Sequence, residues 1–192
     1  LGADFFVCSP YKFLGPHCGV LAAAPELLAG VRPDKLLPSP DTVPERFEFG
    51  TLPYEVLAGT TAAVDFLAAL DPGAGTGRRQ RLTHSLGALH EHERTLRARL
   101  QEGLTALGDA VTLHSKASDR TPTLLMTLEG RDAREAQAHL AGRGVVAPAG
   151  SFYAYEPFTA LKLENPALRV GLAPYNTEDD VDRFLDGLGA FL

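Results

Sequence analysis

The stretch that decides the fold is Ala3-Asp4-Phe5-Phe6-Val7-Cys8-Ser9-Pro10-Tyr11-Lys12, a short apolar and aromatic run that ends at a lysine. Runs of this kind, bounded by turn residues, are typical of buried strands in α/β sheets. The turn signal Gly15-Pro16 follows, and residues 19–24 predict a second strand. A lysine directly after a buried strand is costly unless it is used chemically or reaches solvent. Lys12 is therefore the first candidate for chemistry, with a structural or surface role as the alternative.

The composition is that of an ordinary globular protein and excludes several classes of function. The chain has 192 residues, 45% hydrophobic and 22% charged, with a formal net charge of -6. Because the charge is negative and no long basic run occurs, we expect no nucleic-acid partner. No apolar run approaches the ~20 residues of a membrane helix, so we expect no membrane partner. We expect a cytoplasmic protein in which Cys8 and Cys18 are free thiols.

A metal site is not expected. Cys8, His17 and Cys18 lie close together in the sequence, but their spacing is wrong for zinc and no fourth ligand is evident.

The remaining elements follow from periodicity and from turn residues. Residues 31–45 contain four prolines and predict a long loop, which is often functional in a compact domain. Helices are predicted over 53–70, 85–107 and 132–143 and from Thr177 onward, with a linker over 71–81 and strands over 111–114, 123–128, 145–146 and 168–172. Thr177 and Asp180 resemble a capping box at the start of the last helix.

These elements predict two parts with a boundary near residue 80. Residues 1–80 have the pattern of a remnant of a larger α/β sheet, and residues 81–192 that of a compact α+β domain. The chain begins at Leu1 rather than Met and enters a strand-like run within three residues. We therefore expect it to be a piece of a longer protein.

Three further positions suit anionic groups. Arg169 lies inside an apolar strand, where its planar fork suits a carboxylate, with an internal salt bridge as the alternative. Gly50-Thr51 ends the long loop at the predicted start of a helix, where free N–H groups and a hydroxyl form an anion site, or an ordinary N-cap. Ser9 offers a hydroxyl close to Lys12 that could hold a phosphate.

Ser9 and Lys12 also match the Ser-x-x-Lys nucleophile motif of penicillin-binding enzymes. That motif opens a helix, and its companions Lys-Thr-Gly and Ser-Asp-Asn are missing from this sequence. An acyl-transfer enzyme is therefore a distant alternative.

Three segments, in the order in which they occur, carry a resemblance to a known family. They are Ser-Pro-Tyr-Lys-Phe-Leu-Gly-Pro at 9–16, Arg-Phe-Glu-Phe-Gly-Thr at 46–51 and Leu-Arg-Val-Gly-Leu-Ala-Pro-Tyr-Asn-Thr at 168–177. The chain resembles the class V aminotransferase family of pyridoxal 5'-phosphate (PLP) enzymes, which includes cysteine desulfurases, selenocysteine lyases and isopenicillin N epimerase. The resemblance implies an α/β fold-type-I PLP-dependent transferase. This chain would be the C-terminal part of its large domain (1–80) plus its α+β small domain (81–192).

The resemblance also implies a role for each matching residue. Lys12 would hold the cofactor as a Schiff base and move the α-proton, and Ser9 would contact the cofactor phosphate. Gly50 and Thr51 would reach the phosphate bound by the other subunit, because family members are homodimers with shared active sites. Arg169 would bind the α-carboxylate of a small amino-acid substrate. The cofactor itself would stabilise the carbanion.

Two departures from the family pattern limit what the resemblance implies. Tyr11 replaces the histidine that many members carry before the lysine, and residues 149–154 contain no cysteine where desulfurases carry the one that forms the persulfide. Because a persulfide needs a thiolate nucleophile, we expect a desulfurase-related enzyme whose substrate is unassigned, with transaminase, lyase and epimerase chemistry all open.

A further gap concerns the upstream half of the family's site. The family's acidic partner of the pyridine nitrogen would lie before Leu1, so the fragment alone is expected to be inactive. A non-catalytic interaction domain with an exposed apolar face is the alternative.

Overall fold

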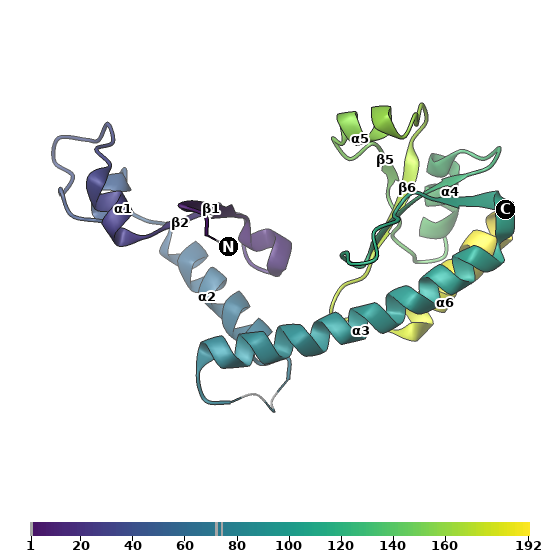
Figure 1. Ribbon diagram of the computed structural model, residues 1–192, viewed down its shortest axis with the longest axis horizontal. Coiled ribbons are helices and arrows are strands. Elements are labelled where there is room, and N and C mark those ends of the chain that lie inside the picture. Colours follow the sequence, from purple (N-terminus) through teal and green to yellow (C-terminus); the bar gives the residue numbers. More distant parts are fainter. Residues whose placement is uncertain (1, 72, 74) are drawn as a thin grey trace. The chain divides into compact units, whose positions relative to one another are not determined.

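The computed structural model describes residues 2–71, 73 and 75–192, which pack as two units, Leu1–Leu86 and Gly87–Leu192 (Figure 1). Helix α3 (Arg78–Ala106) contributes to both units. The described residues do not include Leu1, Pro72 and Ala74. Pro72 and Ala74 belong to the expected linker over 71–81, so this part of the prediction also lies outside the described residues.

The first unit combines a two-stranded sheet with short helices and helix α2. Its elements before α3 are β1 (Phe5–Cys8), the 3-10 helix η1 (Pro10–Phe13), β2 (Val20–Ala23), α1 (Pro25–Gly30), the 3-10 helix η2 (Glu45–Phe47) and α2 (Tyr54–Ala68). Strands β1 and β2 pair in antiparallel fashion. Both predicted strands are thus confirmed, as is the helix predicted over 53–70. The proline-rich residues before η2 form a loop.

The strand β1 is exposed, so the prediction of a buried strand is wrong for this chain. Val7 is 71% exposed and Leu21, its partner on β2, is 61% exposed. An apolar run without polar alternation is typical of a strand covered on both faces, and the described residues of this unit provide no such cover for the two strands. A two-stranded sheet is marginally stable by itself. The exposed apolar face that was expected for a non-catalytic interaction domain is therefore present on β1 and β2.

Helix α2 is attached to the start of α3 by a buried hydroxyl. Ser85 is fully buried, and its Oγ donates to the Ala68 carbonyl at 3.3 Å and accepts from the Asp71 N–H at 3.1 Å. The buried face of α2 includes Ala63 and Ala68, whereas Leu57 is 45% exposed. The buried face of this helix therefore does not extend to Leu57 near its N-terminal end.

Helix α3 begins at Arg78, earlier than the predicted start at residue 85. Arginine and glutamine are good helix formers, and the basic run 78–81 continues the helix rather than the linker. Arg78 also pairs with Asp65 of α2, with Nε and Oδ1 2.9 Å apart.

The second unit is a four-stranded antiparallel sheet with helices packed against it. After α3 its elements are the 3-10 helix η3 (Gly108–Ala110), β3 (Val111–Leu113), β4 (Thr123–Leu128), α4 (Ala133–Ala141), β5 (Ala149–Gly150), α5 (Tyr155–Ala160), β6 (Ala167–Gly171) and α6 (Glu178–Phe191). The strand order is β3-β4-β6-β5. The strand predicted at Val145-Val146 is wrong: these residues form no strand, Val146 is 92% exposed, and β5 is the strand that pairs with β6 at this edge.

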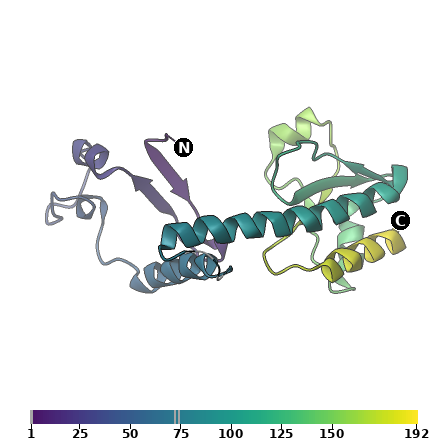
Figure 2. The same cartoon turned by 60° about the horizontal axis from the view of Figure 1, so that its bottom comes forward.

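The core of the second unit lies between this sheet and helices α3, α4 and α6, of which α3 and α6 run side by side (Figure 2). Its fully buried side chains include Leu100, Leu104, Leu124, Met126, Leu140, Leu168 and Leu188. The predicted capping box at the start of α6 is confirmed, because Thr177 and Asp180 bond reciprocally to each other's backbone N–H groups.

Every helix in the described part of the chain is too short or too polar to span a bilayer. Among residues 2–71, 73 and 75–192, no cluster of three or more His, Cys, Asp or Glu side chains is placed to hold a metal ion.

The close approach of α3 and α6 yields the first prediction. A Cβ added at Gly103 would overlap the side chain of Leu185, so Gly103→Ala should destabilise the protein by about 1–2 kcal/mol despite alanine's better helix propensity. Gly87→Ala, in the same helix with nothing within 4 Å of the added Cβ, should be neutral or stabilising by up to about 1 kcal/mol. Thermal unfolding of both variants measures this, and equal effects would contradict the described packing.

The capping box yields the second prediction. The Thr177 backbone N–H, together with the Asn176 side chain, holds the pKa of Asp180 below its usual value. The stability that Asp180 contributes is therefore present above its ordinary pKa and is lost as the pH falls through the lowered folded-state pKa. Asp180→Asn should lower the melting temperature at pH 6, and the difference from the wild type should shrink toward pH 3. Asp179→Asn, which removes neither bond of the capping box, is the matched control and should lower the melting temperature at pH 6 less than Asp180→Asn does.

Candidate active site

The Lys12 segment is a tight turn that follows directly on β1. Ser9 is extended, and its carbonyl accepts from the Lys12 N–H at 2.9 Å. Leu14 ends the 3-10 helix in the left-handed region with φ 70°, which lets the Gly15 N–H donate to the Pro10 carbonyl at 2.9 Å. Pro10 is buried. The lysine is thus fixed by its backbone, while its side chain reaches solvent.

The Lys12 side chain is exposed and lies near an aromatic ring. Its Nζ lies 5.7 Å from the centre of the Tyr11 ring, and that ring stacks on His17 with centroids 4.9 Å apart. Within the described part of the chain, neither Lys12 Nζ nor the Ser9 hydroxyl forms a hydrogen bond or an ion pair. An amine and a hydroxyl therefore lie free on one turn. An acyl-transfer site requires a nucleophile that is hydrogen-bonded to a base. Ser9 and Lys12 do not form such a pair.

Helix α2 supports this turn from one side. A Cβ at Gly59 would meet the Pro16 ring at 3.4 Å, so the helix approaches the chain just after the turn closely. The next residue of α2, Thr60, lies beside Cys18, with Oγ1 and Sγ 3.6 Å apart. The position of Lys12 thus depends on packing between α2 and residues 16–18.

The structure places Gly50 and Thr51 before a helix rather than at its start. Helix α2 begins at Tyr54 with Pro53 as its N-cap, so the prediction that Gly50 and Thr51 lie at the start of a helix is wrong, and Thr51 is not its N-cap. Gly50 has φ 147°, a left-handed value that suits glycine, and both residues are exposed. No hydrogen bond or ion pair within the described residues joins either of them to Ser9 or Lys12.

Arg46 fastens the segment that leads to Gly50, a role that the sequence did not suggest. Its Nη1 donates to the Val31 carbonyl at 3.1 Å and to the Ala29 carbonyl at 3.4 Å. These carbonyls lie at the end of α1, where a cation is favourable. The only sequence signal was the position of Arg46 in the middle block of the family resemblance.

Arg169 lies on β6 with its side chain on the face of the sheet away from the core. Its neighbour Leu168 is fully buried, whereas Arg169 is exposed and lies opposite Leu125 of β4. Its guanidinium carbon is 4.1 Å from the centre of the Phe152 ring. The internal salt bridge, the alternative for this arginine, is not formed with any described residue. The guanidinium N–H groups are therefore free for an anion.

Phe152 belongs to a strained turn that the sequence did not reveal. The Ala154 N–H donates to the Ser151 carbonyl at 2.9 Å, and the two residues between them, Phe152 and Tyr153, have φ 56° and 58°. Left-handed backbone costs a non-glycine residue roughly 1–2 kcal/mol, and such strain occurs often at functional sites. No glycine or asparagine marked this turn in the sequence.

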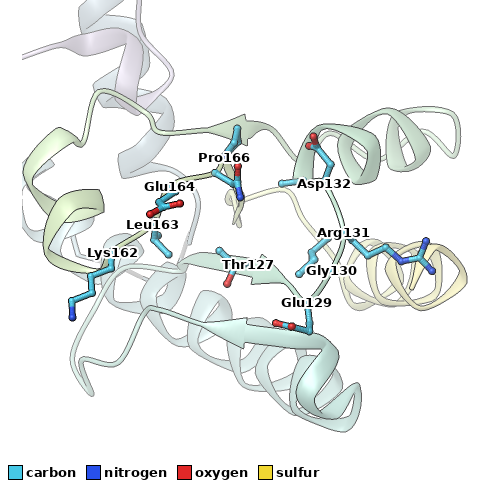
Figure 3. A pocket seen from close by; sticks show the side chains of 12 residues that line it. Thr127, Glu129, Gly130, Arg131, Asp132, Lys162, Leu163, Glu164 and Pro166 are labelled. Atoms are coloured by element: carbon cyan, nitrogen blue, oxygen red, sulfur yellow. The ribbon is translucent and has the colours of Figure 1, made fainter.

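A separate pocket of about 540 Å³ lies elsewhere in the second unit (Figure 3). It is bordered by the segment from Thr127 to Ala133 and by the segment from Lys162 to Pro166. Figure 3 shows carboxylates from both segments around it, with Glu129 and Asp132 on one and Glu164 on the other. None of the sequence-predicted site residues lines this pocket.

Comparisons with known proteins identify the fold and the family. The family described as "Aminotransferase class-V" matches residues 1–184. A probable cysteine desulfurase of Pseudomonas putida is 32% identical over 98% of this chain and 45% of its own length. The crystal structure of a cysteine desulfurase from Escherichia coli matches with a TM-score of 0.75 and 25% identity, over 97% of this chain and 45% of the other. An apo cysteine desulfurase from Thermococcus onnurineus NA1 has a TM-score of 0.82 at 22% identity, over 98% of this chain and 47% of the other.

The chain therefore belongs to the class V aminotransferase family and has the fold of its PLP-dependent members. It is related to cysteine desulfurases and spans slightly less than half of their length. The expected family and fold class are thus confirmed.

The residues around Lys12 fit PLP by their chemistry. A primary amine without an internal partner suits the cofactor's aldehyde carbon, and the Ser9 hydroxyl at the start of the same turn suits its phosphate.

The tight turn around Lys12 yields the third prediction. A Cβ at Gly15 would lie 2.9 Å from Pro10 Cβ and 3.0 Å from the Pro10 carbonyl oxygen. Gly15→Ala should therefore open the turn and destabilise the first unit by about 1–3 kcal/mol. Gly19→Ala, with nothing within 4 Å, should have little effect. Hydrogen exchange at residue 15 should become faster only in Gly15→Ala; unchanged protection there would contradict the described turn.

Proposed function

We propose that this chain is the C-terminal part of a PLP-dependent class V enzyme, related to cysteine desulfurases, that acts on a small amino acid. The observation that carries the proposal is the turn from Ser9 to Lys12, which presents a free amine and a free hydroxyl after β1 in a chain that matches the family over residues 1–184. The enzyme would work as a cytoplasmic homodimer with shared active sites.

Each proposed role follows from the chemistry of one side chain. Lys12 would hold the cofactor through its ε-amine and carry the substrate α-proton on Nζ. The Ser9 hydroxyl would donate to the cofactor phosphate. The exposed Gly50 N–H and Thr51 hydroxyl would bind the phosphate held by a second copy of the chain. When bound, PLP supplies the electron sink for the carbanion.

Arg169 would orient the substrate by its α-carboxylate. Its guanidinium contacts the Phe152 ring but forms no hydrogen bond or ion pair with a described residue. A planar fork binds a carboxylate through two parallel hydrogen bonds. A carboxylate held in this way fixes one end of a small amino acid.

Persulfide formation is not part of the proposal. Residues 149–154 form β5 and the strained turn, and contain no thiol. Cys8 and Cys18 are both free but lie in the first unit, on β1 and before β2. Without a thiolate beside the carboxylate site, sulfur transfer from cysteine has no nucleophile in this segment.

A second candidate function is a non-catalytic interaction domain, and the exposed strands of the first unit favour it. Phe5, Phe6, Val7 and Leu21 are all between 47% and 71% exposed. An apolar surface of this kind marks a site of association.

Labelling with PLP distinguishes the two functions and gives the fourth prediction. The chain has four lysines: Lys12, Lys35, Lys116 and Lys162. After incubation with PLP and reduction with borohydride, peptide mapping should find the adduct mainly on Lys12, because the Ser9 hydroxyl on the same turn is free to bind the phosphate. The Thr159 hydroxyl, which lies on the same turn as Lys162, donates instead to the Tyr155 carbonyl at 2.9 Å. Lys12→Ala should remove most of the label, and Lys116→Ala, a change at an exposed lysine, should retain it.

Equal labelling of the four lysines, or no label at Lys12, would contradict the proposed cofactor role and leave the interaction domain as the better description.

A further inference from the structure

The contact between Phe152 and Arg169 restricts the guanidinium while leaving its donors free. A ring 4.1 Å from the guanidinium carbon attracts the cation through its face. The N–H groups of a guanidinium lie in its own plane. No hydrogen bond or ion pair with a described residue occupies these groups, whereas a salt bridge would occupy them. The Phe152 ring thus restricts the Arg169 guanidinium, while the N–H groups of the guanidinium remain free to bind an anion.

The ring is itself held in place by the chain around it. The Ser151–Ala154 hydrogen bond closes the turn, and the left-handed backbone at Phe152 directs its side chain back along β5. An added Cβ at Gly150 would lie 3.8–3.9 Å from two ring atoms, so the ring passes over this glycine at van der Waals distance. Arg169 is fixed to the same edge, because its N–H donates to the Pro148 carbonyl at 2.9 Å. The Phe152 ring and the Arg169 guanidinium thus both lie where β5 pairs with β6.

We propose that Phe152 is a positioning residue for Arg169, and that the turn 151–154 makes this end of the sheet a preformed receptor for a carboxylate. The inference rests on the proposed carboxylate role of Arg169 and extends it to a second residue. An arginine side chain has four rotatable bonds, and ordering it opposes binding. Because the ring already restricts the guanidinium, a carboxylate binds with less loss of side-chain freedom. The strained backbone serves to place the ring.

The contact between Phe152 and Arg169 and the binding of a carboxylate are measured separately, in the full 192-residue chain. NMR at about pH 6 follows the Arg169 Nε–H group, which should resonate upfield in the wild type because of the Phe152 ring current. Phe152→Leu should abolish this shift and raise the apparent Kd for acetate, the probe carboxylate, about two- to fivefold. Phe152→Tyr keeps the ring and should preserve both.

Tyr153→Leu is the matched control. Tyr153 is the neighbouring aromatic residue, has nearly the same φ of 58° and is fully exposed. Its replacement should leave the Arg169 shift and the acetate Kd unchanged. If Tyr153→Leu weakens acetate binding as much as Phe152→Leu, the effect belongs to the turn as a whole and the inference is overturned.

Arg169→Ala separates failure of the inference from failure of the proposed function. If this variant loses acetate binding while Phe152→Leu binds as tightly as the wild type, only the positioning role is wrong. If Arg169→Ala binds acetate as the wild type does, the carboxylate role of Arg169 is wrong and the positioning role falls with it.

Discussion

The antiparallel pairing of β4 with β6 is the constraint on which the second unit depends. In the observed register Met126 lies opposite Leu168 and Leu125 opposite Arg169. Side chains alternate between the faces of a sheet, so a slip by one residue would expose Leu168 and turn Arg169 into the core. Burying a leucine or methionine contributes about 1.5–3 kcal/mol, whereas burying an unpaired guanidinium costs far more. The core therefore determines that Arg169 lies on the open face.

The two proposed functional positions are held by different means. Arg169 is fixed by a well-packed sheet, and its side chain is then restricted by Phe152. Lys12 is fixed by a short turn whose strands are exposed and whose support comes from α2. The first unit has less buried apolar surface around its functional residue than the second. Added apolar cover over β1 and β2 would stabilise the Lys12 segment, and this connects the exposed strands to the proposed cofactor role.

Much of the fold could be predicted from the sequence because periodicity and end signals agree there. The helix predicted over 132–143 and the capping box at Thr177 and Asp180 follow from local patterns, and the structure contains both. The errors occur where local signals mislead. The basic run before residue 85 resembles a linker but continues the helix, and Val145-Val146 is apolar yet exposed. The exposure of β1 could not be read from its composition, because composition indicates a strand's preference and not what covers it.

The candidate site was predictable only as separate residues. The three segments that carry the family resemblance contain Ser9, Lys12, Gly50, Thr51 and Arg169, and the comparisons with known proteins confirm the family. Phe152 has no signal in the sequence, since its importance arises from a left-handed turn between non-glycine residues and from a contact across the sheet edge. Likewise, the structural role of Arg46 depends on α1 and the residue after it, which bring the Ala29 and Val31 carbonyls to its guanidinium.

A crystal structure of the protein grown with PLP tests the central claim most directly. We expect continuous density between Lys12 Nζ and the aldehyde carbon of the cofactor, with the phosphate beside the Ser9 hydroxyl. Cofactor density on another lysine, or crystals without cofactor at Lys12 under saturating PLP, would contradict it.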